Sequence, residues 1–203
     1  LFDPDILNRT ALAAGAVNDR VVIEVGPGPG GLTRAILDQG AKSLTCIEAD
    51  PRFAEALSAW PEANDGRLSV IRSDARKVDW PTLPEIAAAT SPAMIIANLP
   101  YNVGTPLLVT WLKAKDWRGE MALMFQKEVA EHACATPGSR HYGRLAVLTA
   151  AVCEAHIAFT LPPGAFRPPP KVDSAVAVFR PLPSEQRFED LTSRGKITTA
   201  AFG

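Results

Sequence analysis

The chain has few cysteines, and their pattern excludes two kinds of site. Only three are present, Cys46, Cys134 and Cys153, and no two of them form a Cys-x-x-Cys pair. An odd, widely spaced set of thiols fits neither a disulfide framework nor a zinc site, and it favours a reducing compartment. We therefore expect no metal, and we expect the protein in the cytoplasm or, alternatively, in mitochondria.

Long apolar runs and an excess of one charge are also missing. No stretch approaches the roughly 20 uninterrupted apolar residues of a membrane helix, so we expect no membrane partner. The 21 Lys and Arg residues nearly balance the 22 Asp and Glu residues. The overall charge therefore does not indicate nucleic acid, although a local basic face is compatible with this balance. At 203 residues and 47% hydrophobic, the chain can bury one full core.

What the chain does contain is a glycine-dense loop between two apolar segments. Residues 21–31 read VVIEVGPGPGG, and LTRAILDQG follows with the apolar spacing of a helix. The glycines satisfy the G-x-G-x-x-G spacing of dinucleotide sites and equally the spacing G-x-G-x-G. This pattern predicts a strand, a tight loop and a helix of the nucleotide-binding α/β kind. A tight turn without a ligand is the alternative.

The residues between the glycines distinguish the possible ligands. Pro27 and Pro29 have no backbone N–H group, so they remove two donors that a pyrophosphate needs. Glu24 adds a carboxylate that repels a phosphate and attracts a cation. We therefore predict that Glu24, Gly26 and Gly28 bind S-adenosylmethionine, whose sulfonium and ammonium groups are positive. An NAD-dependent dehydrogenase is the disfavoured alternative.

Acidic residues end the next two predicted strands. Glu48 lies near the end of the strand predicted over residues 43–50, where this architecture holds ribose hydroxyl groups. Asp74 follows the next predicted strand, and its carboxylate can accept a hydrogen bond from the 6-amino group of adenine. Their neighbours Ala49 and Ala75 belong to the same predicted cofactor pocket. The alternatives are a surface glutamate for Glu48 and a turn cap for Asp74.

The predicted chemistry is concentrated at Asn98-Leu99-Pro100-Tyr101, which ends another buried strand. The Asn98 side-chain carbonyl and a main-chain carbonyl held outward by Pro100 can accept hydrogen bonds from one exocyclic amine. Tyr101 offers a flat face to the base that carries this amine. An adenine amine held in this way can attack a methylsulfonium carbon without a strong general base. An Asn-Pro turn with a packing tyrosine is the alternative.

Two loops carry basic residues that suit RNA. Residues 136–144 contain Arg140 and Arg144 beside a histidine and a tyrosine, a combination that fits a phosphate backbone with an unstacked base. A plain surface loop is the alternative interpretation of this cluster.

The second loop, over residues 162–172, is stiffened by prolines and carries Phe166, Arg167 and Lys171. A rigid loop with an aromatic ring between basic residues can close over a flipped base, opposite Tyr101. A proline-rich crossover with Phe166 in the core is the alternative.

Several segments, taken in order, resemble the small-subunit ribosomal RNA adenine dimethyltransferase family. They are VIEVGPGPGGLT, IEAD, SDA, NLPYNVGTPLL, FQKEVAEH, YGRLAVL and FRPPPKVDSAV. The resemblance implies an α/β protein with a Rossmann-like class I methyltransferase fold, a seven-stranded, mostly parallel sheet with helices on both faces. It also implies a monomer that uses S-adenosylmethionine to dimethylate two adjacent adenosines near the 3′ end of small-subunit ribosomal RNA.

The resemblance assigns roles to individual residues. Gly26 and Gly28 line the methionine part of the cofactor, Glu48 holds the ribose, Asp74 the adenine and Asn98 the target amine, while Tyr101 and Phe166 sandwich the target base. Two alternatives share the same core. One is a large-subunit RNA methyltransferase of the antibiotic-resistance type, and the other is a mitochondrial transcription or ribosome-assembly factor.

The resemblance also predicts how the chain is divided. It implies a catalytic domain over residues 1–183 and the start of a helical C-terminal domain over residues 184–203. The family opens with a Gln-Asn-Phe-Leu segment that touches the cofactor, and Leu1 matches the last residue of this segment.

Overall fold

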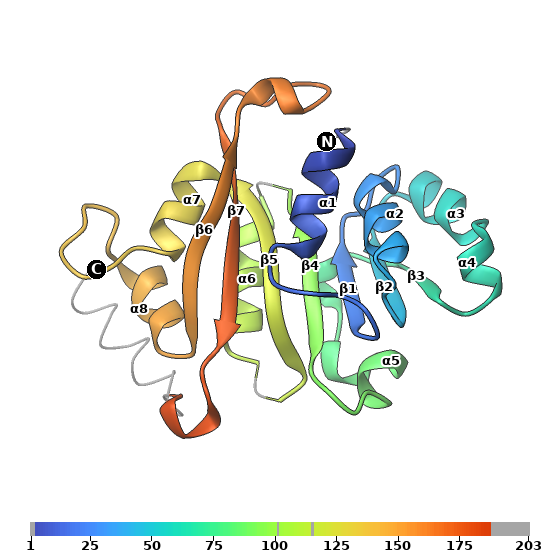
Figure 1. Cartoon of the computed structure of the whole chain (residues 1–203), viewed down its shortest axis with the longest axis horizontal. Coiled ribbons are helices and arrows are strands. Elements are labelled where there is room, and N and C mark those ends of the chain that lie inside the picture. Colours follow the sequence, from blue (N-terminus) through green and yellow to red (C-terminus); the bar gives the residue numbers. More distant parts are fainter. Residues whose placement is uncertain (1–2, 101, 115, 188–203) are drawn as a thin grey trace.

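A seven-stranded sheet runs through the computed structural model, which describes residues 3–100, 102–114 and 116–187 (Figure 1). The strands are β1 (Val21–Val25), β2 (Ser43–Glu48), β3 (Leu68–Arg72), β4 (Ala93–Asn98), β5 (Arg118–Gln126), β6 (Cys153–Leu161) and β7 (Ser174–Pro181). The α-helices are α1 (Pro4–Leu12), α2 (Gly31–Asp38), α3 (Pro51–Ser58), α4 (Pro61–Asn64), α5 (Pro84–Ala87), α6 (Gly104–Leu112), α7 (Lys127–Ala133) and α8 (Arg144–Ala150). Short 3-10 turns are η1 (Ala75–Lys77), η2 (Trp80–Thr82), η3 (Pro163–Ala165) and η4 (Ser184–Gln186).

Some of the sequence predictions fall on residues outside this description. They concern Leu1, Tyr101 and the greater part of the second domain, residues 188–203. Their predicted roles, and the boundary after residue 183, therefore stay predictions.

The strand order confirms the predicted fold class. Along the sheet the strands lie in the order β3-β2-β1-β4-β5-β7-β6. The ladders from β3 to β5 are parallel, whereas β7 runs antiparallel to β5 and β6. The chain builds outward from β1 to β3 and then returns to place β4 on the other side of β1. The carboxyl ends of β1 and β4 therefore meet at a topological switch point, where open α/β sheets bind ligands.

The central strands are buried on both faces, as is usual for parallel sheets covered by helices. All five residues of β1 are buried, and so are the first five of β4. Helices α1 and α2 cover one face of the sheet, and α6, α7 and α8 cover the other (Figure 1). No helix among residues 3–100, 102–114 and 116–187 is long and apolar enough to span a bilayer.

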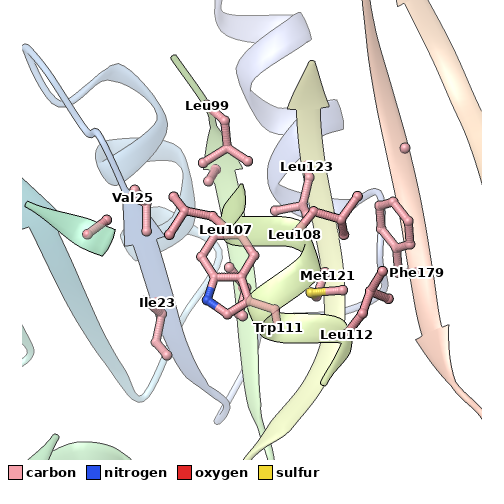
Figure 2. Close-up of a cluster of buried hydrophobic side chains, with 14 of the residues drawn as sticks. Ile23, Val25, Leu99, Leu107, Leu108, Trp111, Leu112, Met121, Leu123 and Phe179 are labelled. Carbon is pink, nitrogen blue, oxygen red and sulfur yellow. The ribbon is translucent and has the colours of Figure 1, made fainter. Parts of the chain in front are cut away.

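Side chains of α6 form an apolar core against one face of the sheet. Figure 2 shows Leu107, Leu108 and Trp111 of α6 packed among side chains of the central strands. Trp111 is fully buried, and truncating such a side chain to alanine costs about 3–5 kcal/mol. These side chains of α6 therefore support the central strands.

Capping residues set where the helices at the ligand edge begin. Asp3 accepts a hydrogen bond from the Asp5 N–H at 2.9 Å, and Pro4 follows at the first position of α1. Asp50 and Pro51 begin α3 in the same way. Both starts follow the preference for Asp at the cap and Pro at the first helical position.

Candidate active site

The glycine loop follows β1 at the switch point, and its backbone takes conformations that favour residues without a Cβ atom. Gly26 and Gly28 have φ values of +68° and +55°, in the left-handed region. The Gly26 N–H donates to the Ile47 carbonyl at 3.0 Å. A Cβ atom on Gly26 would lie 3.7 Å from Cδ of Pro100. The loop after β1 therefore packs directly against the segment that ends β4.

Glu48 is held against this loop. Its side chain is 7% exposed, and its two oxygens accept the Gly28 N–H at 3.0 Å and the Asp50 N–H at 2.8 Å. Each carboxylate oxygen has a second lone pair that can accept a ligand hydroxyl group. The carboxylate takes up a loop donor that a pyrophosphate would need, which supports the preference for a cationic ligand over NAD.

Glu24 lies beneath the loop and is buried. It is 1% exposed, and Oε2 accepts the Thr33 hydroxyl at 2.7 Å and the Cys46 thiol at 3.5 Å. Burial raises the pKa of Glu24 to about 7, and the nearby charge of Glu48 acts in the same direction. The sequence predicted a carboxylate beside the loop, but its partners and its burial were not apparent.

Asp74 caps the turn that follows β3. It accepts the Arg76 N–H at 2.9 Å and pairs with the Arg76 guanidinium at 2.6 Å. This guanidinium lowers the pKa of Asp74 to about 2. Both carboxylate oxygens already accept hydrogen bonds from Arg76, so the structure shows the turn cap, and the adenine contact stays a prediction. Of the two neighbouring alanines assigned to the pocket, Ala75 is buried and Ala49 is exposed.

Asn98 ends β4 beside the loop. Its partner in β5 is Met124, and its side chain is partly exposed. Among the described residues, no side chain or main chain forms a hydrogen bond with the Asn98 amide. The amide is therefore available to a ligand.

The main chain after Asn98 shows which carbonyl can join it. The Pro100 carbonyl already accepts the Val103 and Gly104 N–H groups, each at 3.1 Å, at the start of α6. The Leu99 side chain is buried, and its N–H donates to the Met124 carbonyl at 3.2 Å. No donor in the described part of the chain reaches the Leu99 carbonyl. This carbonyl, fixed by the following proline, is thus the available main-chain acceptor.

A small pocket adjoins this segment on the side of α6 and α7. The sequence pattern did not indicate this pocket, because its lining comes from two stretches of the chain, residues 99–105 and 125–129. The residues that line it are Leu99, Pro100, Gly104, Thr105, Phe125, Gln126 and Val129.

Phe166 lies at the same edge of the sheet. Its loop joins β6 to β7, and Ser174 at the start of β7 pairs with Gln126 at the end of β5. Phe166 is half-buried and packs against a cluster that includes Met124, the partner of Asn98. It is thus neither fully in the core nor free in solvent.

The predicted basic residues fall into two groups. Arg167 and Lys171 lie in the β6–β7 loop, above the ligand edge in Figure 1. Arg140 and Arg144 lie around the α7–α8 connection at the side of the molecule. All four side chains are exposed, and Arg140 donates to the His141 ring at 2.7 Å. The structure does not bring the four residues into one patch.

A parallel sheet closed by an antiparallel β7, with a glycine loop and acidic residues at the β1–β4 switch point, defines a class I methyltransferase fold. No cluster of His, Cys, Asp and Glu able to hold a metal occurs within the described ranges. A family model described as ribosomal RNA adenine dimethylase matches residues 1–202. The chain belongs to this family, as the sequence predicted.

Relatives and solved structures agree with this assignment. Ribosomal RNA small subunit methyltransferase A of Maricaulis maris is 49% identical over 206 residues, which cover 100% of this chain and 70% of that protein. The protein of the same name from Gluconobacter oxydans is also 49% identical, over 100% of this chain and 65% of its own length. The chain thus spans about two thirds of these relatives.

Two solved structures are similar over nearly the whole chain. A dimethyladenosine transferase from Plasmodium falciparum has a TM-score of 0.75 and 27% identity, covering 99% of this chain and 66% of its own. The 23S rRNA methyltransferase ErmE has a TM-score of 0.80 and 26% identity, covering 100% of this chain and 78% of its own. Both likenesses confirm the predicted fold. The predicted role of each site residue stays a prediction.

Proposed function

We propose that the protein uses S-adenosylmethionine to dimethylate the 6-amino groups of two adjacent adenosines near the 3′ end of small-subunit ribosomal RNA. Membership of the dimethylase family supports the reaction, and the names of the relatives support the substrate. One observation carries the chemistry. At the end of β4, the Asn98 amide and the Leu99 carbonyl are hydrogen-bond acceptors that no described donor occupies.

The acidic residues around the glycine loop fit a cationic cofactor. Glu24 and Glu48 are buried, and none of the described basic side chains pairs with either. A positively charged cofactor would balance these carboxylates. Glu48 and Ala49 would hold the ribose, Asp74 and Ala75 the adenine, and Gly26, Gly28 and Leu1 the methionine part. The bound cofactor supplies an electrophilic methyl group on a sulfonium.

The two acceptors at β4 would activate the target amine. A 6-amino group is a weak nucleophile because its lone pair is delocalised into the purine ring. Asn98 and Leu99 would hold its two hydrogens, which localises the lone pair and aims it at the methyl carbon. Because the strand and Pro100 fix the main chain here, the Leu99 carbonyl would be preorganised for this step.

Aromatic and basic residues would present the base. Tyr101 and Phe166 would stack on the two faces of a flipped adenine, since base stacking on aromatic rings is worth about 1–3 kcal/mol per base. Arg167 and Lys171, beside Phe166, would bind the adjoining phosphates, and Arg140 and Arg144 would bind RNA farther along the surface. We expect a monomeric catalytic domain over residues 1–183 that acts on ribosomes in the cytoplasm.

The test is methyl transfer to defined ribosomal particles. The protein is incubated with labelled S-adenosylmethionine and small ribosomal subunits that lack the modification. We expect up to four methyl groups per subunit, two on each adenosine. Absence of incorporation by the full-length protein, with cofactor binding shown separately, would overturn the proposal.

Methylation of large-subunit RNA is the second candidate, because ErmE, a 23S rRNA methyltransferase, has the same fold over the whole chain. A parallel reaction with large ribosomal subunits decides between the two. Label on the large subunit alone would replace the small-subunit assignment.

A further inference from the structure

Two acidic side chains share the base of the glycine loop. Glu24 is 1% exposed and Glu48 is 7% exposed, and the charge of one acts on the other. Within the described ranges, no Lys, Arg or His forms an ion pair with either of them. Two buried carboxylates without a counter-ion are costly, so one of them is best kept neutral until a cation arrives.

The surroundings of Glu24 favour its neutral form. Glu48 accepts two backbone N–H groups, one at each oxygen. Glu24 has only neutral side-chain donors, Thr33 from α2 and Cys46 from β2. Of the titratable groups that act on Glu24, Cys46 and Glu48 both come from β2. Burial, the largest cause, raises the pKa of Glu24 to about 7, so a large share of it carries a proton near neutral pH.

We infer that Glu24 is the charge-selecting residue of the cofactor pocket, and that it releases its proton to solvent when a positively charged cofactor binds. The step breaks only the carboxyl O–H bond, so the carboxylate remains in the pocket as the counter-ion of the ligand. The inference rests on the proposed function in that the cation is S-adenosylmethionine. What is added to that function is the release of one proton when the cofactor binds.

The protonation of Glu24 determines how the affinity for the cofactor changes with pH. A ligand that prefers the ionised form of Glu24 must displace a proton at low pH but not at high pH. Near pH 6 about one tenth of Glu24 is ionised, and near pH 8 about nine tenths, for a pKa near 7. The cofactor should therefore bind about tenfold more weakly at pH 6 than at pH 8.

Calorimetry measures the released proton directly. S-adenosylmethionine is titrated into the protein at pH 6.5 in two buffers with different enthalpies of ionisation. The difference between the two observed enthalpies gives the number of protons exchanged. We expect release of a large fraction of one proton from the natural protein and none from the Glu24→Gln variant. We also expect the variant to bind with an affinity that does not change between pH 6 and 8.

Two controls isolate charge as the cause. The Glu120→Gln variant alters a carboxyl group that pairs with Arg20 at 2.8 Å on β5, outside the pocket, and it should keep the full proton release. Methylthioadenosine has neither the ammonium nor the sulfonium group and should bind without proton release. S-adenosylhomocysteine has only the ammonium, so release with this ligand would assign the effect to that group, and its absence to the sulfonium.

The outcomes separate the inference from the proposed function. No binding of S-adenosylmethionine at any pH would refute the proposed function. Tight binding without proton exchange would refute the inference alone, and so would equal proton release with methylthioadenosine. Circular dichroism of the Glu24→Gln variant checks that it is folded. If the variant does not fold, the comparison of the charged and neutral ligands on the natural protein still decides.

Discussion

Gly28 donates its backbone N–H to the Glu48 carboxylate at 3.0 Å, which ties the glycine loop to the end of β2. The same carboxylate accepts the Asp50 N–H at 2.8 Å, so one side chain positions two backbone segments of the proposed cofactor pocket. The loop is thus held in place before any ligand binds, and part of the ordering cost of cofactor binding is already met.

This relationship predicts the effect of Glu48→Gln. A glutamine side chain keeps one acceptor oxygen, but its NH₂ group would face a backbone N–H and lose that hydrogen bond. With the charge also lost, we expect cofactor affinity to fall by about 10- to 100-fold, or roughly 1.4–2.8 kcal/mol. Calorimetry measures it, with the exposed Glu55→Gln on α3 as the control. Equal affinity in both variants would contradict the role of Glu48.

The Asn98→Ala change tests the amine-holding pair. We expect cofactor binding to persist and the barrier to methylation to rise by about 2–4 kcal/mol, the scale of one preorganised polar contact. Single-turnover methylation of small subunits gives the barrier. Asn102→Ala, an exposed position beyond the segment, is the control. Unchanged activity in Asn98→Ala would rule out the role.

Trp60 supports the glycine loop from outside. Its ring atoms lie 2.7 Å from where a Cβ of Gly30 would be, and the Arg34 guanidinium lies 4.5 Å from the ring centroid. We expect Trp60→Leu to loosen the loop and to weaken cofactor binding by about tenfold, without changing the KM for RNA. Trp117→Leu is the matched control, because that ring stacks on Trp80 rather than on the loop. If both variants bind the cofactor equally well, Trp60 only adds stability.

Phe166→Ala tests the loop between β6 and β7. Loss of one stacking face should raise the free-energy barrier to methylation, measured at limiting RNA, by about 1–3 kcal/mol. The affinity for the cofactor should not change. The control is Val172→Ala, which truncates another apolar side chain of the same loop, 46% exposed. A parallel loss of cofactor binding in Phe166→Ala would show that Phe166 acts through the packing of its cluster instead.

Much of the fold could be predicted because the strands have recognisable patterns of apolar and polar residues. The segment VVIEV is apolar at four of its five positions, and AMIIAN places a polar residue directly after a buried run. Parallel strands bring such ends to one edge, so Asn98 could be placed beside the glycine loop without coordinates. The structure confirms this arrangement.

Features that depend on packing between distant segments could not be predicted. The available carbonyl belongs to Leu99 because α6 begins by using the carbonyl of Pro100, and the pattern of the segment does not show this. The contact of Trp60 with Gly30 depends on how α3 ends, some thirty residues after the loop it supports. In each case the sequence names the residue but not its partner.

The buried carboxyl group of Glu24 predicts a dependence of stability on pH. Its pKa lies near 7 in the folded protein, against an ordinary value of 4.5, so the folded state holds the proton more tightly. Stability from this group is therefore complete below about pH 4.5, and it is lost as the pH rises through 7. Glu24→Gln cannot ionise, so its stability relative to the natural protein should rise by about 2–3 kcal/mol between pH 5 and 8.

Urea denaturation without cofactor, at several pH values, measures this difference. Glu120→Gln is the control, for which no change is expected over this range. Although partial burial acts the other way, the pKa of Glu120 is lowered overall by its own backbone hydrogen bond and by Arg20, so the natural residue favours folding at higher pH. This contribution is complete above about pH 4.5, so the stability of Glu120→Gln relative to the natural protein should stay constant from pH 5 to 8. If the Glu24→Gln and natural curves run parallel from pH 5 to 8, Glu24 is ionised throughout this range, and the proton release inferred for cofactor binding has no source.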